Sequence, residues 1–414
     1  MKGLKKLFGL ALFLLAVPAF AQIGCVIQLP PNANVNAIAA HAGGAVVGVI
    51  PEANQFLLSV PNCSANSDSD IRWAELNAST TLPSNSHARY IVAAPTVAAS
   101  WYTTQPNFGL VHLSGALTYA TGLGVVVADI NSWVDYSHPA LAGHLTSGYD
   151  FVVGRPSGVA TLNDSSAGYL DDSSAGYLDQ ATITFLNDSS AGYLDDSSAG
   201  YLDNRGPAYS HGTFVAAILA AVSPRAIIMP LRCFDDKGSS NTWTIAKCIR
   251  WAVNHGARVI NMSFGTLTNA KVVEAAIAYA QANGVALVAS AGNSNTSAPQ
   301  WPAAYSGVIT SAATNLLDVK ASFSNYGSYI FVDAPGVNII SAVPGNLYGI
   351  ASGTSFSAPI IAGTVANVLS GGVTSVTNQI PSCAVNIEAN NPAYIGQLGY
   401  GRVDVLKCVH PNSP

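Results

Sequence analysis

The sequence predicts an α/β protein with a doubly wound, mostly parallel sheet and helices on both faces. Strands and helices are expected to alternate in its central part, over residues 227–234, 242–254, 258–262, 270–283 and 285–289. An earlier run, residues 124–129 (GVVVAD), is a continuous stretch of branched apolar residues. Such a run is typical of a strand that is buried on both faces of a parallel sheet. The acid at its end, Asp129, is expected at the sheet edge where α/β proteins place their chemistry.

Length and composition indicate a globular protein of unusually low charge. The 414 residues suffice for one large domain and a smaller unit. Charged residues make up 9% of the chain, against roughly 25% in an average soluble protein. The net charge of −5 gives no reason to expect nucleic acid or an anionic membrane as a partner.

The first 21 residues read as a secretory signal peptide. Lys2, Lys5 and Lys6 form a basic start, an apolar stretch follows over 7–20, and AFA at 19–21 is a cleavage site. No later run reaches the roughly 18 apolar residues of a membrane span. We therefore expect a secreted protein, extracellular or, after export across an inner membrane only, periplasmic.

Six cysteines follow the signal peptide, and an even number in an exported chain predicts disulfides. Because they fall into three neighbouring pairs, we predict the bridges Cys25–Cys63, Cys233–Cys248 and Cys383–Cys408. No CxxC motif or histidine-rich cluster predicts a metal site.

Residues 22 to about 100 are expected to form a separate α+β unit. A strand is predicted over 25–29, a short helix around Ile38, and two more strands over 45–50 and 55–60. The stretches 64–70 and 77–89 are rich in Ser, Asn and Thr, which predicts linkers. A retained accessory domain is one interpretation of this unit.

Residues 162–203 contain an eight-residue repeat with units such as LNDSSAGY and LDDSSAGY. Five short units make a thin core, so a mobile surface insertion is the preferred interpretation and a small stacked coil the alternative. The repeat aspartates suggest calcium as a ligand, but neither EF-hand nor glycine–aspartate nonapeptide spacing is present.

The stretch 353–359 (GTSFSAP) places Ser355 between small residues at the start of an apolar run. Small neighbours leave room for a substrate, and a helix start offers free backbone N–H groups beside the hydroxyl. Gly-Thr-Ser alone is more often an ordinary helix cap. The longer string resembles the active-site serine segment of the subtilisin-like serine peptidases.

The resemblance extends over about residues 101–408, outside the repeats. The stretch 209–216 (YSHGTFVA) resembles the family's histidine segment, and 290–293 (SAGN) its oxyanion segment. It implies a triad of Asp129, His211 and Ser355, in the order known for subtilisin, with Asn293 as oxyanion donor. It also implies a substrate-binding role for two segments: Ser263, Phe264, Gly265, Ser290, Ala291 and Gly292.

The aspartate segment departs from the family pattern. Ile130 and Asn131 follow Asp129, where the family usually has Thr or Ser and then Gly. The spacing from Asp129 to His138 is also about two residues longer than usual. Asp135 is the rival candidate for the triad acid, although it lies beyond the expected strand end.

The resemblance implies a secreted serine endopeptidase that cleaves peptide bonds through an acyl-enzyme and is made as a self-inhibited precursor. Residues 22–100 would then be an inhibitory propeptide, and residues 101–414 the peptidase domain, starting near Ser100. Protein or peptide substrates and the propeptide would be the partners of a monomer. No cofactor is expected to be required. The family's strongest calcium site is expected to be missing, because Ala140 replaces an aspartate and the loop 221–226 is short.

A second interpretation is a catalytically weak binding protein that keeps the fold. It is motivated by Ile130, Asn131 and the repeat insertion. A surface protein organised by its repeats is a third, but it does not explain residues 205–408.

Overall fold

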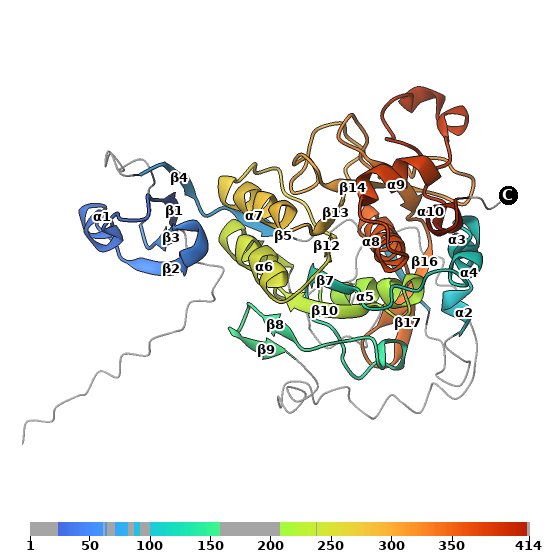
Figure 1. Cartoon of the computed structure of the whole chain (residues 1–414), viewed down its shortest axis with the longest axis horizontal. Coiled ribbons are helices and arrows are strands. Elements are labelled where there is room, and N and C mark those ends of the chain that lie inside the picture. The colour runs from blue at the N-terminus through green and yellow to red at the C-terminus, as the bar shows by residue number, and fades with distance from the viewer. Residues whose placement is uncertain are drawn as a thin grey trace, which may run out of the picture.

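The computed structural model describes residues 24–60, 63, 71–81, 87–91, 100–157, 208–236 and 238–411 (Figure 1). The signal segment and the repeats at 162–203 lie outside the described residues. The chain forms a small N-terminal unit and a main domain around an eight-stranded sheet.

The N-terminal unit is a four-stranded antiparallel sheet with one helix, and has its own core around Ile27, Ile38 and Leu58. Its elements are β1 (Cys25–Gln28), α1 (Val35–His41), β2 (Val46–Ile50), β3 (Gln55–Leu58) and β4 (Trp73–Leu76), in the sheet order β2-β3-β1-β4. The sequence did not indicate β4, a short strand that pairs with β1. In Figure 1 this unit lies beside α6 (Thr242–Asn254) and α7 (Lys271–Ala282).

The linker predicted over residues 77–89 is wrong in part. It contains β5 (Ser79–Thr81) and the start of β6 (His87–Ile91). These strands pair with β11 (Ser239–Asn241) and β17 (Leu347–Ser352) of the main domain. β5 consists of hydroxyl residues (STT) and β6 of mixed polar and apolar ones (HARYI). The partner strands supply the hydrogen bonds that form both.

The main sheet has the strand order β15-β14-β13-β12-β7-β10-β8-β9 and is parallel except for β9. This confirms the predicted mostly parallel sheet. Its strands are β7 (Val126–Asn131), β8 (Gly148–Asp150), β9 (Arg155–Ser157), β10 (Ile227–Arg232), β12 (Val259–Met262), β13 (Ala286–Ser290), β14 (Ile309–Thr314) and β15 (Val332–Pro335).

Helices cover both faces of the sheet, as Figure 1 shows. α5 (His211–Val222) and α8 (Thr354–Ser370) share a core with Val127 of β7. α6 and α7 share the opposite core with Ala128 and Ile130. Since successive strand residues point to opposite faces, both faces of β7 are buried, which explains its unbroken apolar run.

α5 and α8 pack closely against each other. All residues of α5, and all but the last of α8, are buried. A Cβ added at Gly363 of α8 would lie 2.7 Å from Val222, so glycine allows this approach. This packing holds the two helices against each other, and His211 and Ser355 lie in their first turns.

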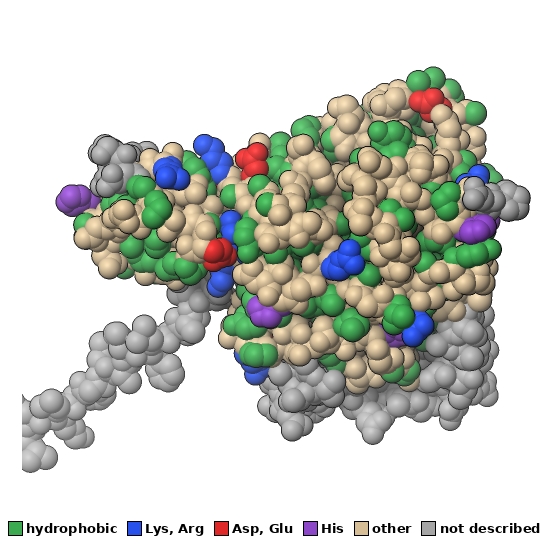
Figure 2. Space-filling model, in the orientation of Figure 1, with side chains coloured by type: hydrophobic (Ala, Val, Ile, Leu, Met, Phe, Trp, Pro, Cys, Tyr) green, Lys and Arg blue, Asp and Glu red, His purple; other side chains and the backbone are tan. Residues whose placement is uncertain are grey.

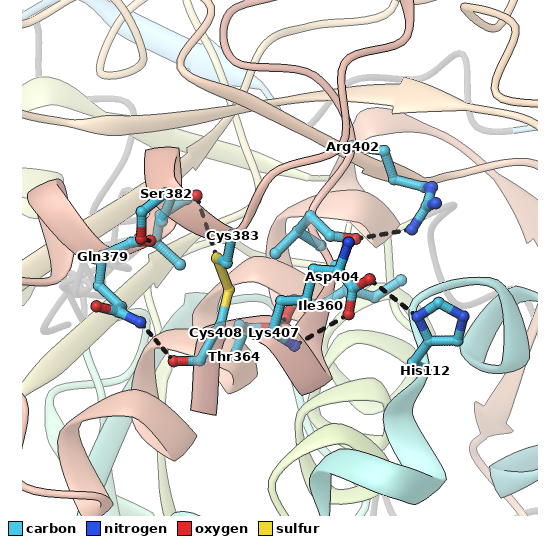
Figure 3. Close-up of a disulfide and its surroundings, with 12 residues drawn as sticks. His112, Ile360, Thr364, Gln379, Ser382, Cys383, Arg402, Asp404, Lys407 and Cys408 are labelled. Carbon is cyan, nitrogen blue, oxygen red and sulfur yellow. Dashed lines mark hydrogen bonds and ion pairs between the residues drawn. A yellow bond between two sulfur atoms is a disulfide. The ribbon is translucent and has the colours of Figure 1, made fainter. Parts of the chain in front are cut away.

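The C-terminal segment closes the domain through α9 (Val376–Cys383) and α10 (Val405–Val409), joined by the disulfide Cys383–Cys408 (Figure 3). Asp404 accepts a hydrogen bond from the Lys407 N–H at 3.1 Å and also contacts His112 Nδ1 at 2.9 Å. The bridges Cys25–Cys63 and Cys233–Cys248 are also present, so all three predicted pairings are confirmed.

The remaining elements are short. They are α2 (Ser100–Thr103), α3 (Pro106–Leu110), α4 (Leu113–Ala116), β16 (Ile339–Val343) and 3₁₀ turns at Pro51–Ala53, Pro139–Leu141, Glu388–Asn390 and Pro392–Tyr394. Figure 2 shows charged side chains only thinly scattered over the face in view. Within the described ranges, none of the helices has the length and apolar character needed to cross a membrane.

Candidate active site

The predicted site residues come together where the central parallel strands end. Asn131 is the last residue of β7, Ser263 follows β12, and Asn293 lies just after β13. The N-termini of α5 and α8 add His211 and Ser355 at the same edge. A site at the carboxyl ends of the strands is the arrangement expected for an open α/β sheet.

Ser355 is the second residue of α8 and is buried. Its Oγ donates a hydrogen bond to the backbone oxygen of Ser263 at 3.2 Å. In return, Ser263 Oγ donates to the backbone oxygen of Ser355 at 2.8 Å. The serine is therefore tied to the end of β12, and its hydroxyl must rotate before its proton can reach a base.

Asn293 is oriented by the residue that precedes the serine. Its Oδ1 accepts hydrogen bonds from the Thr354 N–H at 2.9 Å and from Thr354 Oγ1 at 2.8 Å. Its Nδ2 is buried and has no hydrogen-bond partner among the described residues. Buried donors are rarely left unpaired, so this amide is an oriented donor that is available to an acceptor.

His211 begins α5, and its two neighbours explain the His-Gly-Thr motif. A Cβ at Gly212 would lie only 2.5 Å from the backbone oxygen of Trp133, so the helix start requires glycine there. Thr213 Oγ1 accepts a hydrogen bond from the Asp135 N–H at 2.9 Å. Both contacts fix the imidazole against the segment that follows β7.

The residue in contact with the imidazole is Asn131, whose Oδ1 lies 2.7 Å from His211 Nδ1. The expectation that Asp129 holds the imidazole directly is therefore corrected. β7 continues two residues past Asp129, so its end, and the position against His211, belong to Asn131. Residues two apart on a strand share a face, which places Asp129 directly behind Asn131.

Asp129 is fully buried and is surrounded by amides. Asn131 Nδ2 lies 3.3 Å from each of its carboxylate oxygens, and Asn261 Nδ2 donates to Oδ1 at 2.8 Å. Burial raises the pKa of Asp129 to about 7, and the two amide donors offset this only in part. Burial also lowers the pKa of His211 to about 4, so the imidazole is neutral at neutral pH.

The rival acid, Asp135, is engaged elsewhere. Its Oδ1 accepts hydrogen bonds from the Ser137 N–H at 3.0 Å and from Ser137 Oγ at 2.6 Å. Its Oδ2 accepts one from the Gly345 N–H at 3.0 Å. Asp135 therefore stabilises a turn and the chain near β17.

The two expected substrate-binding segments lie side by side, because they follow the adjacent parallel strands β12 and β13. The side chain of Gln300 lies between them. A Cβ at Gly265 would meet its Oε1 at 2.8 Å, and a Cβ at Gly292 would meet it at 2.3 Å. Gln300 could not be anticipated from the sequence, since a single glutamine before Trp301 carries no recognisable pattern.

A metal site would need a different set of side chains. Over the ranges that the structure describes, no group of three or more His, Cys, Asp or Glu residues is placed to hold an ion. The polar groups at the site are hydroxyl, imidazole and amide groups around one buried carboxyl. This set suits acyl transfer by a serine nucleophile.

The Subtilase family model, a peptidase family, matches residues 122–384, well over half of the chain. The chain belongs to the subtilase family.

Two curated relatives support this assignment. The chain is 34% identical over 259 residues to the thermophilic serine proteinase of Bacillus sp. (strain AK1), a match that covers 60% of this chain and 53% of the relative. It is 33% identical over 303 residues to thermitase of Thermoactinomyces vulgaris, covering 70% of this chain and 90% of thermitase. The match to the first relative thus spans about half of that protein's length.

The fold has solved counterparts. Fervidolysin from Fervidobacterium pennivorans, described as a keratinolytic enzyme related to subtilisin, superimposes with a TM-score of 0.69 at 23% identity. That match covers 95% of this chain and 61% of fervidolysin. A protease from Pseudoalteromonas arctica gives a TM-score of 0.56 at 25% identity, covering 73% of this chain and 94% of that protease. These likenesses confirm the subtilisin-like fold.

In this subtilase, a sequence signal could have identified Asn131. The excess of about two residues between Asp129 and His138 disappears if the count starts at Asn131. Asn131 is also followed by Ser132, in the place where the family has Thr or Ser. Ser132 Oγ in turn accepts a hydrogen bond from the Gly212 N–H at 3.0 Å. Asp129 was expected instead because the chemistry of this position favours an acid.

Proposed function

We propose that this subtilase is a serine endopeptidase with Ser355 as nucleophile, His211 as general base and Asn293 as oxyanion donor. One observation supports this most strongly. His211 Nε2 and Asn293 Nδ2 are both buried polar atoms without a hydrogen-bond partner in the described part of the chain. Residues next to Ser355 lie beside both side chains: the ring centroids of Phe356 and His211 are 5.8 Å apart, and the Thr354 N–H donates to Asn293 Oδ1. A base and a donor thus flank the nucleophile.

The reaction follows from these positions. Ser355 Oγ leaves the Ser263 carbonyl, transfers its proton to His211 Nε2 and attacks the peptide carbonyl carbon. The carbonyl oxygen becomes an oxyanion and accepts hydrogen bonds from Asn293 Nδ2 and the Ser355 N–H. His211 then protonates the leaving amine as the C–N bond breaks. Water hydrolyses the remaining acyl ester by the same steps in reverse.

A fluorophosphonate probe tests this proposal, because it reacts only with an activated serine. We expect one adduct, on Ser355, in the folded and processed protein. The competing function, a binding protein with a weakened site, is favoured by the amide of Asn131 in contact with the imidazole. Folded, processed protein that forms no adduct would support that alternative and overturn the peptidase proposal.

We propose that the N-terminal unit is an inhibitory propeptide. Support comes from its contacts with the two surface helices of the main domain. The Glu75 carboxylate accepts hydrogen bonds from the first N–H groups of α7, Lys271 at 2.7 Å and Val272 at 2.8 Å. Asn77 Oδ1 accepts one from the Trp243 N–H in α6 at 3.1 Å. These contacts use free N–H groups at helix starts, where negative charge is favourable.

Replacing Glu75 with alanine should weaken this association. Loss of a helix-capping side chain changes a stability equilibrium by roughly tenfold. If the association of the N-terminal unit with the main domain weakens by this factor, we expect the Glu75→Ala precursor to mature about tenfold faster. Appearance of the processed protein over time measures this. Glu52→Ala is the matched control, because the carboxylate of Glu52 is more exposed and lies 3.6 Å from Arg250. This single, longer contact involves a carboxylate that is 37% exposed, so it should hold the unit less firmly than the two hydrogen bonds of Glu75. Equal maturation rates for the two variants would contradict the role of Glu75.

We propose that residues 1–21 direct export and that the processed protein acts as a monomer on proteins or peptides. The three disulfides support an oxidising compartment. We also propose that activity requires no cofactor and that the family's strongest calcium site is missing. In support, α5 ends at Val222 and β10 begins at Ile227, which leaves a short connection, and Ala140 offers no oxygen ligand from its side chain.

Gln300 should influence which residue is accepted before the cleaved bond, since it lies between the two segments that are proposed to bind substrate. We expect Gln300→Glu to raise kcat/KM for substrates with Lys or Arg at that position by about tenfold relative to apolar ones, through charge pairing. A set of peptides that differ at that one position measures the preference. Gln281→Glu, the same change on the exposed surface of α7, should leave it unchanged. If the unmodified protein, Gln300→Glu and Gln281→Glu all prefer the same residues at that position, Gln300 does not line the binding site.

A further inference from the structure

We propose that Asp129 and Asn131 act as a positioning pair in place of a single carboxylate: Asp129 orients the Asn131 amide, and the amide oxygen holds the Nδ1–H of His211. Neither side chain needs to touch the substrate. This inference rests on the proposed peptidase function, because it concerns the base of that reaction.

The surroundings of Asn131 permit one orientation of its amide. The Ser132 N–H donates to Oδ1 at 2.9 Å. Nδ2 faces both carboxylate oxygens of Asp129 at 3.3 Å. In the reverse orientation the NH₂ group would face the Ser132 N–H, and above the pKa of Asp129, which is about 7, the amide oxygen would face a carboxylate. Both contacts would then be repulsive, so Asp129 and Ser132 together fix the amide.

The fixed amide determines the histidine tautomer. Oδ1 can only accept, so Nδ1 of His211 must carry the proton in their 2.7 Å contact. Nε2 then has a free lone pair, as a general base requires. In serine peptidases, an amide in this place lowers kcat by about 10⁴-fold when it selects the wrong tautomer. Here the acid behind the amide prevents that outcome.

Asp129 also offers a charge. Its neighbours on the flanking strands are Asn261 of β12 and, in register on β10, Pro230. On the helices that cover this face, α8 has no ionisable residue and α5 has only His211. No cation therefore faces Asp129 from these elements. Once ionised, its carboxylate can stabilise the imidazolium through the polarised amide of Asn131.

The pH dependence follows from the two shifted groups. The pKa of His211 is lowered to about 4, so the neutral base forms as pH rises through that value. The pKa of Asp129 is raised to about 7, so its charge appears only as pH rises through neutrality. We expect kcat/KM to rise in two steps, near these two values, and only the upper step should depend on Asp129.

Three variants separate orientation from charge. Asp129→Asn keeps an acceptor for Asn131 but removes the charge, so the upper step should disappear, with about a tenfold loss at pH 8. Asp129→Leu also frees the amide to rotate, and we expect a loss of about 10³-fold. Asn131→Asp places a carboxylate directly against His211. Activity at pH 8 should rise about tenfold, and the lower step should move upward, because an adjacent anion raises a histidine pKa.

Asp333→Asn is the matched control, since Asp333 is a fully buried acid on β15, at the far edge of the same sheet from β7. Its profile should keep both steps. An upper step that persists in Asp129→Asn, or no loss in Asp129→Leu beyond that of Asp129→Asn, would overturn the pair. If Asp129→Leu does not fold, Asp129→Asn and Asn131→Asp still decide the question.

A readout that needs no activity is the ¹⁵N NMR spectrum of His211, recorded in a Ser355→Ala background at about pH 8. We expect Nδ1 to be protonated with Asp129 present, and a mixture of tautomers in Asp129→Leu. The same mixture with Asp129 present would disprove the orientation argument. If the fluorophosphonate probe fails while the tautomer is as expected, only the peptidase function is refuted.

Discussion

Ser355→Ala is expected to abolish peptide hydrolysis, with kcat falling by about 10⁶-fold, the size of this effect in subtilisin itself. The mutation removes the only atom that forms the acyl ester. It leaves the helix intact, since the backbone oxygen of Ser355 still accepts from Ser263 Oγ at 2.8 Å. Casein hydrolysis and release of a chromogenic peptide measure the loss.

The same variant tests self-processing. If the subtilase removes its own N-terminal unit, Ser355→Ala should accumulate as the unprocessed precursor, which N-terminal sequencing identifies. Ser357→Ala is the matched control on the same helix, because Ser357 Oγ is buried without a hydrogen-bond partner in the described ranges. Its removal should be nearly neutral. Normal hydrolysis by Ser355→Ala would show that another residue is the nucleophile.

The fold could be predicted because its strongest signals are local. The apolar run that forms β7 and the amphipathic pattern of α6 each identify an element without knowledge of the rest. β5 and β6 could not be predicted in this way. Both are short, and each forms its strand by pairing with a distant segment, β11 or β17.

The residues of the site also divide into those that could be predicted from the sequence and those that could not. His211, Ser355 and Asn293 lie in motifs whose neighbours are needed for packing, such as Gly212 against Trp133, so the sequence alone was enough to propose them. The partner of the imidazole depended on where β7 ends, and strand ends are poorly determined by composition. The predicted strand ended two residues before β7 does, so the acid Asp129 was chosen as the partner of His211 instead of the amide Asn131. Glu75 was missed for another reason: its role is created by a helix that lies far along the chain, with a separation of 196 residues between Glu75 and Lys271.

Asn293→Asp is expected to lower kcat by about 10²- to 10³-fold while KM changes little. The substitution is nearly isosteric and keeps the acceptor that holds Thr354 at 2.9 and 2.8 Å. It replaces the unpaired Nδ2 donor with an acceptor, so the oxyanion loses a hydrogen bond that forms only as charge develops. An interaction confined to the transition state affects kcat rather than substrate binding.

Two comparisons identify the lost donor as the cause. Asn293→Ala should lose a similar factor in kcat and, because Thr354 then loses its acceptor, should also have a lower Tm than Asn293→Asp. Asn295→Asp makes the same chemical change two residues away, at a side chain that keeps its acceptor for Lys320 Nζ at 2.9 Å. Its kinetics should match the unmodified protein. If Asn293→Asp also retains full kcat, the oxyanion is stabilised by other groups, and the unpaired amide beside Ser355 has no part in the reaction.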